Sequence, residues 1–134
     1  ADLQDLELAE GDPLYERVAT LADTWNEHDN VGLVVGATAP EELESIRGLV
    51  PDLPFLVPGV GAQGGDAEAA VTHGLAERDR WPADVGLANS SRGIIFAGEG
   101  QAGDAPAGSG AEDAFARAAG QAAKRLKERL NAHR

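Results

Sequence analysis

Segments typical of buried strands alternate with segments typical of helices along most of this chain. Consecutive apolar residues at 31–36, 55–57 and 85–88 are typical of strands covered on both faces. Apolar residues spaced three and four apart separate these strands and predict amphipathic helices. Such alternation favours parallel βα units. A short apolar turn is expected at 94–96 and a final helix at about 111–130.

Three of the predicted helices have recognisable start signals. Asp12 precedes Pro13, which predicts an Asp12 N-cap with proline as the first helical residue. Thr38 stands three residues before Glu41, which predicts a capping box. Asp66 is the expected N-cap of the third helix.

The number of strands limits the architecture. Three parallel strands are too few to close a barrel, and a complete (β/α)₈ barrel takes roughly 250 residues. The chain has 134 residues. We therefore predict an α/β fold that is half of a (β/α)₈ TIM barrel, with residues 1–134 forming a single domain or part of one. Residues 98–110, mostly Gly, Ala, Pro and Ser, are expected to form a flexible loop.

The charge of the chain argues against several partners. Lys and Arg number 11 against 23 Asp and Glu, which gives a net charge of −12. Phosphate backbones and anionic membranes are repelled by such a surface, so neither nucleic acid nor membrane is an expected partner. The acidic, lysine-poor composition fits either adaptation to high salt or a GC-rich genome.

Residue types that support metal, redox or membrane functions are scarce. The chain has no Cys, which excludes disulfides and cysteine metal sites. His28, His73 and His133 lie far apart, without the spacing of metal ligands. No apolar run approaches the length of a membrane span, so a cytoplasmic protein without metal is expected.

The strongest local motif is the glycine-rich segment 59–64, which fits G-x-G-x-x-G between a strand and a helix. A dinucleotide-binding turn is one interpretation, but Pro58 occupies the tight turn and no acidic residue ends a following strand at the expected distance. The alternative is a phosphate cradle, because glycine lets backbone N–H groups approach an anion closely. We favour the cradle, with Gln63 as a ligand contact.

A second candidate anion-binding segment, Ser-Ser-Arg-Gly at 90–93, follows the third strand. Backbone N–H groups at a helix start attract anions, and the Arg92 guanidinium can hold a phosphate through two parallel hydrogen bonds. In (β/α)₈ enzymes phosphate is commonly held by the loops after strands seven and eight. The two loops are therefore expected to bind one phosphate together. The basic cluster at 124–129 is interpreted instead as the cationic end of a helix.

Three segments together form a recognisable family pattern: V-V-G-A-T at 34–38, V-P-G-V-G-A-Q-G-G-D at 57–66 and N-S-S-R-G-I-I at 89–95. They resemble the C-terminal half of orotidine 5′-phosphate decarboxylases, in the branch found in bacteria such as mycobacteria and in salt-loving archaea. The resemblance extends over about 1–97, and its glycine-rich block is highly specific.

The resemblance implies a homodimeric (β/α)₈ barrel that converts orotidine monophosphate to uridine monophosphate and carbon dioxide without a cofactor. Gln63 would reach the phosphate and the pyrimidine side of the nucleotide. Arg92, with backbone N–H groups around Ser91, would hold the phosphate dianion. The substrate-binding residues expected on this basis are Pro58, Gly59 and Val60 near the base, with Gly61, Gln63, Gly64, Ser91 and Arg92.

The catalytic D-x-K-x-x-D pattern of that family, whose lysine protonates the carbon that loses carboxylate, does not occur in this sequence. Lys124 and Lys127 lie in the terminal helix and cannot replace it. No catalytic residue is therefore expected in this chain, which should be inactive alone and should need the N-terminal half-barrel as its partner.

Two other functions remain open. The chain could be a non-catalytic half-barrel that dimerises to cover its sheet edges and binds phosphorylated ligands. It could also belong to another phosphate-binding TIM-barrel enzyme, such as an epimerase or isomerase, whose acid–base residue lies in the other half.

Overall fold

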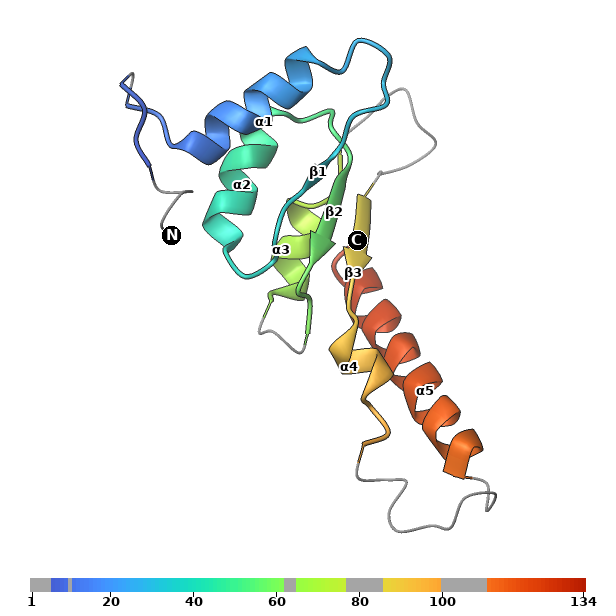
Figure 1. The fold of residues 1–134 in the computed structure, drawn as a ribbon. Helices are drawn as coiled ribbons and strands as arrows, with labels where there is room; N and C mark the ends of the chain where they lie inside the picture. The colour runs from blue at the N-terminus through green and yellow to red at the C-terminus, as the bar shows by residue number, and fades with distance from the viewer. Residues whose placement is uncertain (1–5, 10, 62–64, 77–85, 100–110) are drawn as a thin grey trace.

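The computed structural model describes residues 6–9, 11–61, 65–76, 86–99 and 111–134 (Figure 1). The predicted alternation of strands and helices is confirmed within these ranges. Most of the predicted loop at 98–110 lies outside the described residues. In chain order the elements are α1 (Leu14–Thr24), β1 (Leu33–Val34), α2 (Pro40–Leu49), β2 (Phe55–Pro58), α3 (Ala67–Thr72), β3 (Gly86–Asn89), α4 (Arg92–Ile95) and α5 (Ala111–Asn131).

The three strands form one parallel sheet in the order β1-β2-β3. Each strand lies beside the next one in the chain, and a helix connects β1 to β2. Parallel strands joined in this way place all their carboxyl ends at one edge of the sheet. This arrangement of βα units is part of a (β/α) barrel, as the sequence predicted.

One face of the sheet is covered at its central strand β2, and the opposite face is open. Phe55 and Val57 are each 1% exposed and form the centre of the core beneath the helices. The opposite face carries a row of register partners, Val34, Leu56 and Leu87, of which the two outer side chains are 70% exposed. The expectation of strands covered on both faces is therefore wrong for this chain. A closed barrel buries that second face in its interior, which needs more strands than these three.

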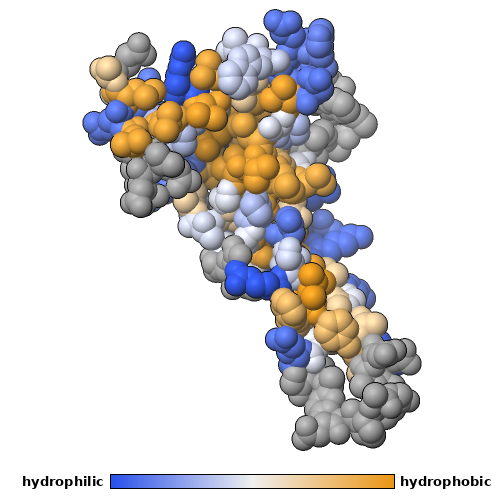
Figure 2. Space-filling view, in the orientation of Figure 1, coloured by the Kyte–Doolittle hydropathy of each residue, from blue (hydrophilic) through white to orange (hydrophobic). Residues whose placement is uncertain are grey.

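Apolar side chains gather over the sheet in the space-filling view (Figure 2). The exposed Val34 and Leu87 belong to strands that flank β2 on either side. A contiguous apolar area of this kind normally marks a surface that another element covers.

Two of the predicted helix caps are wrong. The N-cap of α1 is Pro13, and the N-cap of α2 is Ala39; neither helix has a side-chain cap. Pro13 has an extended ψ of 146°, which places Asp12 one residue outside the capping position. In α2 a proline occupies the first turn, where its missing N–H removes one donor that a Thr38 cap would satisfy.

The third predicted cap is confirmed. The Asp66 carboxylate accepts hydrogen bonds from the backbone N–H groups of Glu68, at 2.8 Å, and Ala69, at 3.4 Å. This cap fixes the start of α3 directly after the glycine-rich segment.

A buried arginine joins the ends of two helices to the start of β2. Arg47 of α2 is only 9% exposed, and its guanidinium carbon lies 3.6 Å from the centroid of the Phe55 ring. Arg47 therefore lies at the amino-terminal edge of the sheet, at the opposite end of the strands from the predicted binding site. The guanidinium donates hydrogen bonds of 2.9–3.2 Å to the backbone carbonyl oxygens of Val50, Pro51, Leu53, His73 and Gly74.

Candidate functional site: a pocket at the carboxyl edge of the sheet

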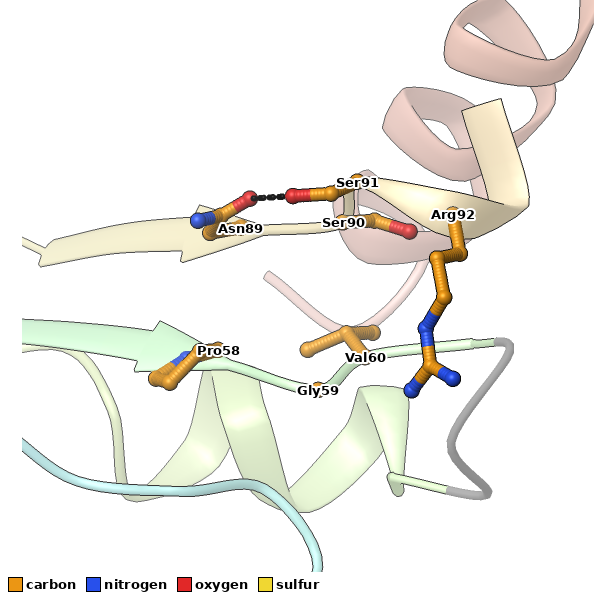
Figure 3. Close-up of a pocket in the computed structure, with 7 residues that line it drawn as sticks. All are labelled: Pro58, Gly59, Val60, Asn89, Ser90, Ser91 and Arg92. Atoms are coloured by element: carbon orange, nitrogen blue, oxygen red, sulfur yellow. Dashed lines mark hydrogen bonds between the residues drawn. The ribbon is translucent and has the colours of Figure 1, made fainter. Parts of the chain in front are cut away.

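A pocket lies where β2 and β3 end. Its volume is about 100 Å³, and its walls are the segments 58–60 and 89–92 (Figure 3). Pro58 and Asn89, the last residues of the two strands, are register partners. The loops that leave these strands therefore start side by side. The predicted convergence of the glycine-rich segment and the Ser-Ser-Arg-Gly segment thus follows from the register of the sheet.

The first loop, between β2 and α3, requires glycine both where it begins and where it ends. Gly59 and Gly61 have φ values of 91° and 100°, in the left-handed region that disfavours other residues. The Gly65 N–H donates to the Gly59 carbonyl oxygen at 3.2 Å, which closes the loop. A Cβ at Gly65 would overlap that carbonyl oxygen and lie 2.9 Å from the Ala37 Cβ.

Replacing Gly65 with alanine is expected to destabilise the protein by about 2 kcal/mol, since a buried methyl group would force the loop open. Binding of phosphorylated ligands should weaken with it. Gly48→Ala, where a Cβ meets nothing within 4 Å inside α2, is the matched control and should stabilise by up to about 1 kcal/mol. Urea denaturation measures both, and equal midpoints for the two variants would contradict this account of the loop.

The second loop carries the polar side chains of the pocket. The Ser91 hydroxyl donates to the Asn89 side-chain oxygen at 3.4 Å, while Ser90 and Arg92 also face the pocket (Figure 3). The Ser91 carbonyl accepts hydrogen bonds from the N–H groups of Ile94 and Ile95, which hold the short helix α4. The chain thus turns sharply after β3 and directs Arg92 across the pocket.

The Arg92 guanidinium reaches the level of the Gly59–Val60 backbone in the opposite loop (Figure 3). No carboxylate forms an ion pair with it among the described residues. Carboxylates outnumber basic groups two to one in this chain. An arginine that stays unpaired beside two glycine- and serine-lined loops is suited to bind an anionic ligand.

The structure brings most of the predicted binding residues together, while their binding role stays a prediction. Ser90, from the predicted Ser-Ser-Arg-Gly segment, also lines the pocket, and so does Asn89, which was not predicted as a binding residue. The position of Asn89 at the end of a strand, directly before that segment, was the signal that could have found it. Gly61 borders the adjoining cavity, and Gln63 and Gly64 lie outside the described residues. The predicted residues that line the pocket are Pro58, Gly59, Val60, Ser91 and Arg92.

The described parts of the chain contain neither a metal-binding cluster nor a membrane-spanning helix. No cluster of three or more His, Asp or Glu side chains suited to a metal ion occurs there. None of the helices in these ranges has the length and apolar character to cross a bilayer.

Parallel βα units with a pocket at their carboxyl edge define part of a (β/α)₈ barrel. The chain is 68% identical, over all 134 residues and 47% of the relative, to the orotidine 5′-phosphate decarboxylase of Halorubrum lacusprofundi. It is 69% identical over 133 residues to that of Haloarcula marismortui, covering 99% of this chain and 45% of the relative. Among solved structures, a UMP synthase from Leishmania donovani matches 98% of this chain and 24% of its own, with 39% identity and a TM-score of 0.67.

No family model matches the chain. The curated relatives and the solved structure nevertheless agree, and the chain belongs to the orotidine 5′-phosphate decarboxylase family. It spans about half the length of the curated relatives it matches.

Proposed function

We propose that the chain is the C-terminal half of an orotidine 5′-phosphate decarboxylase and supplies its phosphate-binding loops. The complete enzyme would convert orotidine monophosphate to uridine monophosphate and carbon dioxide without a cofactor. The observation that carries this proposal is the pocket at the ends of β2 and β3, with Arg92, which pairs with no described carboxylate, directed into it. The names of the relatives agree with it.

The size and lining of the pocket suit a phosphate group. A volume of about 100 Å³ accommodates a phosphate but not a whole nucleotide. Arg92 would donate two parallel hydrogen bonds to the dianion, with the hydroxyls of Ser90 and Ser91 beside it. Pro58 and Asn89 share the open face of the sheet with Leu56 and Leu87, because side chains alternate along a strand. The nucleoside would therefore extend from the pocket over this open face.

Binding of a remote phosphate can serve catalysis at the pyrimidine. Contacts to a non-reacting group lower the barrier when their binding energy is realised in the transition state. The D-x-K-x-x-D pattern is absent from this sequence, so the proton donor would come from the remainder of the barrel. On this proposal the chain alone binds the phosphate end of the nucleotide and does not decarboxylate it.

Calorimetric titration with uridine monophosphate tests the proposal, on this chain and on a longer protein that contains it. The longer protein should bind uridine monophosphate far more tightly than uridine, and it should decarboxylate orotidine monophosphate. A longer protein that binds but does not decarboxylate would favour the non-catalytic half-barrel. Equal affinity for uridine and uridine monophosphate would contradict a phosphate site.

The proposal also includes the salt concentration in which the enzyme works, its location in the cell and its oligomeric state. The excess of acidic residues, together with haloarchaeal relatives, supports an enzyme that works in high salt. The family resemblance also supports a cytoplasmic homodimer. Sedimentation of the complete protein in concentrated KCl would measure its mass, and a monomeric mass would contradict the dimer.

A further inference from the structure

Helix α5 lies on the outer side of the two loops that form the pocket. A cavity of about 440 Å³ lies between them, and it shares Val60 and Ser90 with the pocket. Both compartments therefore have these two residues in a common wall. On the α5 side the cavity is lined by Arg125 and Arg129, with Leu126 between them.

Arg129 lies beside Gly61 of the first loop and lines the same cavity as Ser90 of the second. A Cβ placed on Gly61 would be 3.4 Å from the Arg129 Nη2 atom and 3.8 Å from the Ser90 Oγ atom. Gly61 belongs to the first loop and Ser90 to the second. The guanidinium of Arg129 thus stands behind the point where the two loops meet.

Two positive charges on this face of α5 have no carboxylate partner among the described residues. Arg125 and Arg129 are four residues apart on one helix face, where two like charges destabilise a helix slightly. Neither forms an ion pair with a carboxylate in the described ranges. On a neighbouring face, Lys124 and Glu128 have the same spacing and do pair, at 3.9 Å. The helix dipole accounts for cations near this helix end, but it does not account for two unneutralised arginines that face the loops.

The orientation of this face is set by packing. Leu126 and Leu130 pack against the hydrophobic core from the same helix. Because the partly buried Leu126 also lines the cavity, its packing orients this face of α5, with the exposed Arg125 and Arg129, toward the loops. The packing of α5 against the core therefore determines which way both arginines face.

We propose that Arg129, with Arg125 beside it, is a positioning residue of the anion pocket. Its guanidinium raises the positive potential behind Gly61 and Ser90, while Arg92 contacts the ligand from within the pocket. A phosphate dianion is then held between cationic groups on two sides. This assignment rests on the proposed phosphate site, and it adds a contribution from α5 that the sequence analysis had interpreted as a dipole effect.

The test is calorimetric titration of the complete protein with uridine monophosphate. Arg129→Gln is expected to weaken binding about fivefold, the size of one partly solvated charge interaction. Arg129→Lys should recover most of this loss, since it restores the charge. Lys124→Gln, in the same region of α5 but on the face that carries the ion pair, is the matched control and should leave affinity unchanged. Uridine should bind equally to all of these proteins.

Two results would overturn the assignment. One is wild-type affinity for uridine monophosphate in Arg129→Gln, and in Arg129→Met if the glutamine variant does not fold. The other is an equal loss of affinity for uridine and uridine monophosphate, which would indicate a distorted site and not a lost charge. Arg92→Ala separates the two proposals. Suppose that Arg92→Ala abolishes the preference for uridine monophosphate over uridine, while Arg129→Gln leaves that preference unchanged. The proposed phosphate site then stands, and only the role of Arg129 is refuted.

Discussion

Arg92→Ala in the complete protein is expected to raise the KM for orotidine monophosphate sharply and to lower kcat/KM about 10³-fold. Arg92 is the cationic side chain that points into the pocket, and it makes no ion pair with a described carboxylate. Its loss removes two charge-assisted hydrogen bonds from the phosphate and with them the remote binding energy available to the transition state. Arg92→Lys should recover only part of the activity, because an ammonium group cannot form the bidentate contact.

Steady-state kinetics with two substrates checks this result. With orotidine, which lacks the phosphate, Arg92→Ala and the wild type should have the same kcat/KM. Arg17→Ala, on the exposed side of α1, is the control for loss of one positive charge. Kinetics with orotidine monophosphate that match the wild type would remove Arg92 from the site.

Arg47→Met is expected to destabilise the fold by about 4 kcal/mol. The guanidinium is buried, and it donates to five carbonyl oxygens at the ends of α2 and α3 and before β2. Methionine retains apolar volume but leaves those carbonyls without their donor in a buried environment. The contact with the face of the Phe55 ring, at 3.6 Å, is lost as well.

Denaturant unfolding measured by circular dichroism would report the loss. Arg47→Lys should also destabilise, since one ammonium group cannot reach carbonyls that lie on different sides of a planar guanidinium. Arg17→Met makes the same chemical change at an exposed position and should alter stability by less than about 0.5 kcal/mol. A loss below about 1 kcal/mol for Arg47→Met would show that other donors or water replace the guanidinium.

Local signals in the sequence predicted features whose causes are also local. Asp66 was recognised as a cap because an aspartate before an apolar helical pattern satisfies the first free N–H groups of the helix. The same reasoning failed at Asp12, because Pro13 itself occupies the capping position, and at Thr38, because Pro40 begins the helix and Ala39 occupies the capping position. Alternating strands and helices were predicted correctly because hydrophobic periodicity is a property of each segment alone.

The burial of Arg47 could not be predicted from local sequence patterns. Its neighbours in the sequence predict an exposed residue near the end of an amphipathic helix, as arginine usually is. Its burial depends on carbonyl groups from segments more than twenty residues away, which only the packing of α2 against α3 and β2 brings together. The α5 arginines are a second example, since their relation to Gly61 and Ser90 exists only in the folded chain.

By itself, the sequence determined the alternation of elements, the glycine- and serine-lined loops and the family, because each is encoded in contiguous residues. The tertiary structure decided which strands lie side by side, and therefore that segments 58–60 and 89–92 enclose one pocket. It also decided that one face of the sheet stays open and that an arginine is buried at the opposite edge. These features depend on contacts between residues that are distant in the chain, and a local sequence pattern does not predict the energies of such contacts.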